Sequence, residues 1–161
     1  MAEQGTSEIT KRTWVVPVDD TPASERALQW TFNNLFRKGD ELHLLHVIPE
    51  AVPEVMTDFM IYNADPEDHA RMVEKAKALL SSRYEPHCRE AGGICNMHIV
   101  HYHTDTGSIG TAIGKLADNY NATAVIMAKH NKGLVKEALL GSATKATSKH
   151  CTKPLVLLHE E

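Results

Sequence analysis

The sequence predicts a single-domain α/β fold: an open parallel sheet of five strands with helices on both faces. Short apolar runs typical of buried strands alternate five times with segments of helical periodicity. This is the pattern of a parallel sheet with right-handed crossovers. The 161 residues are enough for one domain with a proper core. An apolar content of 42% and a charged content of 24% are ordinary for a globular domain.

The first strand and helix carry clear local signals. Residues 14–18 form an apolar run, Trp-Val-Val-Pro-Val. Pro17 lacks the N–H that a strand ladder needs, so it marks a place where the strand stops pairing. Thr21 and Pro22 are residue types favoured at the N-cap and at the first position of a helix. We expect this helix to end shortly before Gly39.

The remaining elements continue the alternation. Segment 49–65 has no firm period and is predicted to be a loop or a short mobile turn. Gly92-Gly93 ends the second helix, and Asn121 is a plausible left-handed cap of the third. The other expected strands span 41–48, 94–102, 125–128 and 155–158, and the other expected helices span 66–89, 109–120 and 142–150.

Two strand orders suit five such strands, 3-2-1-4-5 and 2-1-3-4-5. In the first, the order reverses between strands 1 and 4. Asp19 ends strand 1, and the loop that begins at Lys129 follows strand 4. Both would then line one crevice at the carboxyl ends of the strands, where ligands bind in such sheets. This convergence favours the order 3-2-1-4-5.

The loop that begins at Lys129 has the composition of a phosphate-binding loop. Long loops between a strand and a helix are uncommon in compact domains and are usually functional. Lys132 and Lys136 add positive charge, and Gly141-Ser142 opens a helix. Glycine lets backbone amides approach a ligand, and a helix N-terminus favours anions.

Several segments, in order and spacing, resemble the universal stress protein (UspA-like) domain family over about residues 12–160. They are Val16–Asp19 with Ser24–Leu28, Leu45–Ile48, Gly107–Ile109, Leu139–Ser142 and His150–Leu158. The resemblance implies a Rossmann-like fold and a regulatory protein that binds ATP or another adenine nucleotide, with or without Mg²⁺. It also implies a homodimer formed through the last strand, Leu155–Leu158. An exposed apolar edge strand independently favours such pairing.

The resemblance further implies which residues contact the nucleotide. They are Pro17, Val18, Asp19 and Val47 around adenine and ribose; Met127, Ala128 and Asn131 along the loop; and Gly141, Ser142, Ala143 and Thr144 at the phosphates. Members that bind ATP carry Gly-x2-Gly-x9-Gly-Ser/Thr, and here Ala128 and Asn131 replace the first two glycines. Asparagine tolerates left-handed backbone best among non-glycine residues. The methyl group of Ala128 matters only if the ligand packs against its Cα or if positive φ is needed.

Two other functions remain open. One is a homodimeric interaction protein of the same fold that binds no nucleotide, which the replaced glycines favour. The other is a flavodoxin-like electron carrier, although its long loop would follow strand 1. No residue stands out as a general base beside a phosphate site, so we expect no catalytic residue and at most slow ATP hydrolysis.

Charge and composition narrow the partners and the compartment. A formal net charge of -4 gives no bulk attraction for nucleic acid or an anionic membrane. No apolar run approaches a membrane span. The polar residues 1–11 are expected to form a disordered tail before a domain at 12–161, and we expect a cytoplasmic protein.

Cysteine and histidine patterns give no firm metal site. Three cysteines without a close pair are expected to be free thiols in a reducing compartment. His98, His101 and His103 lie on one predicted strand. Because side chains alternate along a strand, only two of them share a face, which is too few for metal binding.

Overall fold

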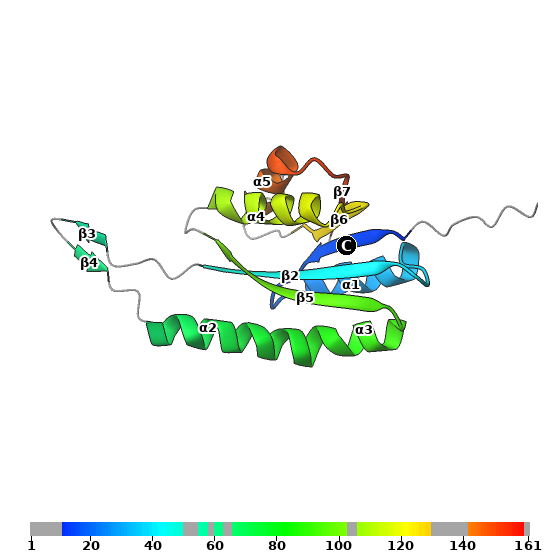
Figure 1. Cartoon of the computed structure of the whole chain (residues 1–161), viewed down its shortest axis with the longest axis horizontal. Helices are drawn as coiled ribbons and strands as arrows, with labels where there is room; N and C mark the ends of the chain where they lie inside the picture. The colour runs from blue at the N-terminus through cyan, green and yellow to red at the C-terminus, as the bar shows by residue number, and fades with distance from the viewer. Residues whose placement is uncertain are drawn as a thin grey trace, which may run out of the picture.

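The computed structural model describes residues 11–49, 55–57, 60–62, 66–102, 106–129 and 142–159. Its centre is a five-stranded parallel sheet with the order β5-β2-β1-β6-β7 (Figure 1). The strands are β1 (Thr13–Pro17), β2 (Glu41–Pro49), β5 (Ile94–Tyr102), β6 (Ala124–Ala128) and β7 (Leu155–Leu158). The predicted fold class and strand order, 3-2-1-4-5, are confirmed.

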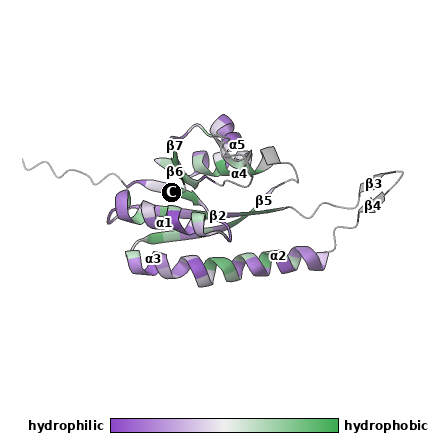
Figure 2. Ribbon diagram, turned by 180° about the vertical axis from the view of Figure 1, so that it is seen from behind, coloured by the Kyte–Doolittle hydropathy of each residue, from purple (hydrophilic) through white to green (hydrophobic). Residues whose placement is uncertain are grey.

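Helices cover both faces of this sheet. One face carries α1 (Pro22–Asn34), α2 (Pro66–Leu79), the π-helical turn η1 (Leu80–Tyr84) and α3 (Glu85–Ala91); the other carries α4 (Thr106–Asn119) and α5 (Ser142–His150) (Figure 1). The strands alternate accordingly: Val16 faces the α1–α3 core and Val15 the α4 core. Figure 2 shows mostly hydrophobic strands between helices with many hydrophilic residues. Within the described residues, no helix has both the length and the apolar character needed to cross a bilayer.

The connection from β1 to α1 forms as predicted. Thr21 has an extended backbone, with φ −125° and ψ 147°, and Pro22 is the first helical residue. The N–H of Ser24 donates to Thr21 Oγ1 over 3.3 Å. This side-chain cap satisfies one of the N–H groups that a helix start leaves without a partner.

A short hairpin lies in the segment that was predicted to be a loop. β3 (Val55–Thr57) pairs antiparallel with β4 (Met60–Tyr62). The loop prediction over 49–65 is therefore wrong at these two strands. Each strand has only three residues, too few for an alternating pattern to be recognised.

The long helical segment α2–η1–α3 contains a π turn, which was not predicted from the sequence. Its buried residues recur at every fourth position: Ala76, Leu80, Tyr84 and Cys88. An α-helix has 3.6 residues per turn, so residues at a strict four-residue spacing would drift around its surface. The wider π turn takes up this drift. Its backbone signature is the N–H of Glu85 donating to the Leu80 carbonyl, five residues back.

Glycine allows α4 and α5 to pack closely. A Cβ atom built on Gly110 would lie 2.3 Å from the backbone nitrogen of Thr147 and 2.4 Å from the Cβ of Ala146. No other residue type fits there without displacing α5. The contact therefore fixes α5 on α4 and, with it, the place where α5 begins.

The cysteine prediction is wrong for two of the three residues. Cys88 in α3 and Cys95 in β5 form a disulfide, with their Cα atoms 5.9 Å apart. The turn between them brings the end of α3 next to the start of β5. Gly92 caps α3 there with φ 63°, a left-handed conformation that glycine adopts readily. Cys151 is the free cysteine.

Candidate functional site

The carboxyl ends of β1 and β6 diverge where the strand order reverses. Within the described residues, β1 pairs with β6 at two positions, the second being Val15↔Val125. Yet β1 continues beside β2 to Pro17, and β6 continues beside β7 to Ala128. Pro17 thus lies where β1 has left β6, as its missing N–H predicts. Ligands of open α/β sheets bind at such switch points.

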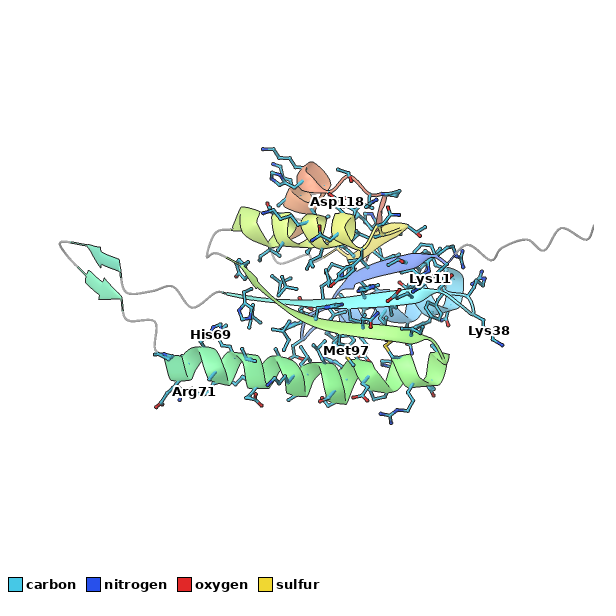
Figure 3. All side chains as sticks on the ribbon, viewed as in Figure 1. Lys11, Lys38, His69, Arg71, Met97 and Asp118 are labelled. Atoms are coloured by element: carbon cyan, nitrogen blue, oxygen red, sulfur yellow. A yellow bond between two sulfur atoms is a disulfide. The ribbon has the colours of Figure 1, made fainter. Side chains whose placement is uncertain are left out.

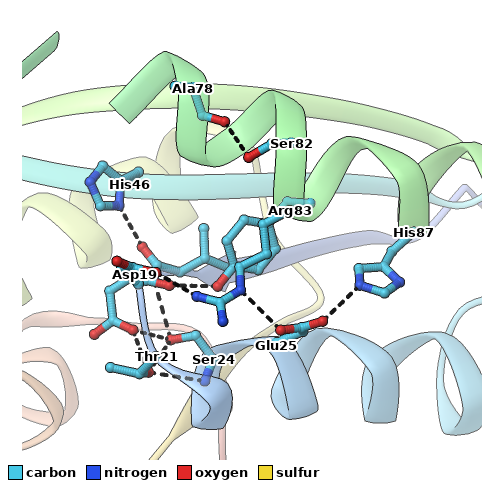
Figure 4. A network of polar contacts seen from close by, with 12 residues as sticks. Asp19, Thr21, Ser24, Glu25, His46, Ala78, Ser82, Arg83 and His87 are labelled. Carbon is cyan, nitrogen blue, oxygen red and sulfur yellow. Dashed lines mark hydrogen bonds and ion pairs between the residues drawn. The ribbon is translucent and has the colours of Figure 1, made fainter. Parts of the chain in front are cut away.

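Asp19 is held at three of its polar groups at this edge (Figure 4). Its Oδ1 accepts hydrogen bonds from Thr21 Oγ1 at 2.5 Å and from Ser24 Oγ at 2.7 Å. Its backbone N–H donates to Ser24 Oγ over 3.2 Å, and its carbonyl accepts from Tyr84 Oη at 2.6 Å. The half-buried carboxylate is therefore oriented before any ligand arrives.

The end of β2 supports the residues next to Asp19. The Val18 N–H donates to the Leu45 carbonyl over 2.8 Å. His46 Nδ1 lies 2.9 Å from the Val18 carbonyl oxygen, which places a proton on that ring nitrogen. Val47 is partly buried and packs into the core on the α4 face. The structure thus brings the residues expected around adenine and ribose, Pro17, Val18, Asp19 and Val47, to two adjacent strand ends.

Met127 and Ala128, at the end of β6, face opposite sides of the sheet. Met127 is buried in the core on the α4 face. The methyl group of Ala128 packs against Ala23 and Ala27 of α1. Among the described residues, Asn121 is the one non-glycine residue with positive φ, as its predicted capping role requires. Ala128 therefore has a backbone conformation that does not call for glycine.

The expected phosphate-binding helix begins at the predicted residue, Ser142. In a parallel sheet the crossover helix runs antiparallel to the strands, so its N-terminus lies at their carboxyl ends. Ala143 is partly exposed, whereas Thr144 is buried with 2% exposure. Asn131, Gly141 and the loop lysines Lys132 and Lys136 lie outside the described residues.

Ion pairs beside Asp19 link η1 and α3 to the start of α1. Arg83 contacts Asp20 at 2.5 Å and Glu25 at 3.0 Å. His87 Nε2 lies 3.1 Å from Glu25 Oε1. These ion pairs were not predicted from the sequence. The four-residue spacing of buried residues in α2–η1–α3 is the signal that could have placed them.

A second polar cluster lies on the opposite face of the sheet. His43 Nδ1 is 2.9 Å from His98 Nε2, and Glu41 Oε1 is 3.4 Å from His43 Nε2. Tyr120 stacks on His43 with ring centroids 3.9 Å apart. Burial lowers the pKa of both histidines, and for His43 it outweighs the opposing effect of Glu41.

The alternation of the β5 histidines is as predicted. His101 lies on the face opposite to His98, and its ring centroid is 5.0 Å from that of His69. His69 lies on α2, on the side that faces the sheet (Figure 3). His103 lies outside the described residues. In the part of the chain that the structure describes, no three His, Cys, Asp or Glu side chains form a group that could hold a metal ion.

Solved structures share this fold over nearly the whole chain. One is the structure of hypothetical protein MJ0577, described as a structure-based assignment of its biochemical function. It has a TM-score of 0.74 at 24% identity and covers 95% of this chain and 99% of that one. A universal stress protein in complex with cAMP has a TM-score of 0.62 at 15% identity, covering 94% and 98%. The universal stress protein from Archaeoglobus fulgidus in complex with dAMP has a TM-score of 0.57 at 17% identity, covering 92% and 98%.

The family assignment comes from the sequence. The comparison with curated proteins found no match. The model of the universal stress protein family, in contrast, matches residues 11–159, which is nearly the full length of 161 residues. The chain belongs to the universal stress protein family.

Proposed function

We propose that this protein binds an adenine nucleotide, ATP, ADP or AMP, in a crevice between the carboxyl ends of β1 and β6, and that nucleotide occupancy alters its surface or assembly. The observation that carries this proposal is the divergence of the two strands beside an oriented Asp19. Two relatives support the ligand class, since their structures are complexes with cAMP and dAMP.

The described residues suggest how the base and ribose are recognised. Asp19 is a carboxylate fixed at a strand end, and it would accept hydrogen bonds from ribose hydroxyls. Next to Asp19, apolar contacts for adenine would come from Pro17, Val18 and Val47.

The phosphates would lie at the start of α5. There Gly141, Ser142, Ala143 and Thr144 would offer backbone N–H groups and two hydroxyls to an anion. Met127, Ala128 and Asn131 would line the approach from β6. A Mg²⁺ ion, if bound, would be held chiefly by the phosphates.

Ala128 at the first glycine position of the motif is compatible with this proposal. Its backbone does not need positive φ, and its methyl group is buried against α1. The replacement of this glycine therefore argues less strongly against nucleotide binding than the motif alone suggests.

We propose a regulatory role rather than an enzymatic one, with at most slow ATP hydrolysis. The described residues at this edge offer a positioned carboxylate and apolar contacts. Because Asp19 Oδ1 already accepts two hydrogen bonds, this atom is poorly suited to act as a general base. We also propose that the protein acts in the cytoplasm. The Cys88–Cys95 disulfide does not support this location, because disulfides persist mainly in oxidising compartments.

A homodimeric interaction protein without nucleotide is the second candidate. It is favoured by β7, an edge strand whose four residues, Leu155–Leu158, are all apolar and partly exposed. This role and nucleotide binding are separable by experiment.

Two measurements test the proposed function. The purified protein is denatured, and released nucleotide is identified by chromatography. ATP, ADP, AMP and adenosine are then titrated into nucleotide-free protein by calorimetry. Release of an adenine nucleotide, or binding that saturates, supports the proposal. No release and no binding at roughly millimolar ATP, a Kd corresponding to about −4 kcal/mol, would leave only the interaction protein.

A further inference from the structure

Tyr84 reaches Asp19 from a different layer of the molecule. Its side chain is completely buried, with 0% exposure, and its hydroxyl donates to the Asp19 carbonyl over 2.6 Å. The two residues are 65 positions apart in the sequence. Burial, followed by the nearby charge of Asp19, raises the pKa of Tyr84 to about 12. The phenol therefore keeps its proton and donates throughout the physiological range.

The π turn is what places this hydroxyl. Tyr84 is the last residue of η1, and it stays in register with Ala76 and Leu80 because the wider turn absorbs the drift of a four-residue spacing. Arg83, the residue before it, is paired with Asp20 and Glu25. Two consecutive residues of one irregular turn thus hold the β1–α1 connection. π turns of this kind recur at functional sites.

The other partners of Asp19 come from its own connection. Thr21 and Ser24, which bond its carboxylate, lie within five residues of it, at the start of α1. Those hydrogen bonds set the side-chain rotamer relative to α1. The Tyr84 hydrogen bond instead fixes the peptide that leaves Asp19 relative to the α2–α3 layer. Loss of this bond would free the connection to shift as a unit.

We infer that Tyr84 is a positioning residue of the nucleotide site: through the Asp19 carbonyl, it holds the Asp19 carboxylate where the ribose is recognised. This inference rests on the function proposed above. Tyr84 does not itself touch the ligand, so its effect on affinity should require Asp19.

The test is a thermodynamic cycle measured by calorimetry with adenosine and with ATP. It uses the parent protein, Tyr84→Phe, Asp19→Ala and the double variant. Phenylalanine keeps the buried ring and removes only the donor. Tyr120→Phe is the matched control, because it removes the same group from a tyrosine on the opposite face of the sheet. Thermal unfolding verifies that each variant is folded.

We expect Tyr84→Phe to weaken adenosine and ATP by the same factor, about three- to tenfold, since one hydrogen bond that orients the ribose contact is lost. In the Asp19→Ala background the same change should have no further effect. Tyr120→Phe should bind like the parent. Unchanged affinity of Tyr84→Phe, or an equal loss with and without Asp19, would overturn the inference.

Failure of the parent to bind either ligand contradicts the proposed function instead. The positioning role is then decided in the free protein by amide hydrogen exchange. Tyr84→Phe should speed exchange at the Asp19 amide by about tenfold or more relative to Tyr120→Phe. Equal exchange in the two variants would overturn it. The same measurement decides the case in which Asp19→Ala binds too weakly to complete the cycle.

Discussion

At the scale of single residues, the candidate site depends on how firmly Asp19 is held. A carboxylate that already accepts hydrogen bonds from Thr21 and Ser24 loses little conformational freedom when it binds a ligand. The cost of ordering it has been met during folding. Its neighbour Asp20 is different, because its side chain is 82% exposed and pairs with Arg83. Adjacent acids of the same chemistry should therefore differ in their effect on binding.

Asp19→Ala should weaken nucleotide binding while the protein remains folded. The expected loss is about 1–3 kcal/mol, or roughly tenfold to a hundredfold, the range for removing a charged hydrogen-bond partner. Calorimetry with ADP measures it, and Asp20→Ala is the matched control, which keeps Asp19 and should weaken binding much less. Equal affinity of Asp19→Ala and the parent would contradict the proposed site.

Ala128→Gly should destabilise the protein without improving nucleotide affinity. The methyl group is buried against Ala23 and Ala27, and the backbone needs no positive φ. Losing that contact and adding backbone freedom should cost about 1–2 kcal/mol of unfolding free energy. Urea denaturation and an ATP titration measure the two effects. Tighter binding by the variant would show that the motif glycine matters to the ligand directly.

At the scale of elements, features that depend on local sequence signals were predicted correctly, whereas contacts between distant elements were not. The start of α1 was predictable because Thr21-Pro22 carries its own cap. The candidate strand ends were predictable because Asp19 follows an apolar run and parallel topology aligns such ends. Tyr84 was missed because its partner comes from a distant element, and the Cys88–Cys95 disulfide was missed because it depends on how α3 meets β5.

The contact between β2, β5 and α4 predicts a dependence of stability on pH. Burial lowers the pKa of His43 and His98, so the unfolded chain takes up protons at a higher pH than the folded protein does. The unfolding free energy should therefore be highest above about pH 6.5 and fall as the pH drops, by at most about 1.4 kcal/mol per pH unit for each proton. The charged groups facing this pair are Glu41, which contacts His43, and Lys11, which pairs with Glu41.

Urea unfolding at roughly pH 7.5 and pH 5.5 measures this dependence. The double variant His43→Gln/His98→Gln should show a smaller difference between the two conditions than the parent. His159→Gln, at an exposed position, is the control and should keep the parent's difference. An unchanged difference in the double variant would show that these two histidines do not titrate on unfolding in this range.

At the scale of the whole molecule, the two edges of the sheet are unlike each other. β5 is long and carries exposed apolar side chains, with Ile94 at 56% and Met97 at 36% exposure. β7 is short, and all four of its side chains are apolar and partly exposed. β7 pairs with β6, the strand that ends at the proposed site, so assembly through β7 would be closer to the site than assembly through the distant β5 edge.

The protein should therefore be a homodimer that pairs through β7. Edge strands present unpaired N–H and C=O groups, and two-fold self-pairing is the commonest way to satisfy them. Light scattering at micromolar concentration should give twice the chain mass of 17.9 kDa. Val156→Lys places a charge on this edge and should shift the mass toward that of a monomer. Ile94→Lys, on the opposite edge, should leave the dimer intact. A monomeric parent would contradict this assembly, and dissociation of both variants alike would show that the dimer does not depend on β7 in particular.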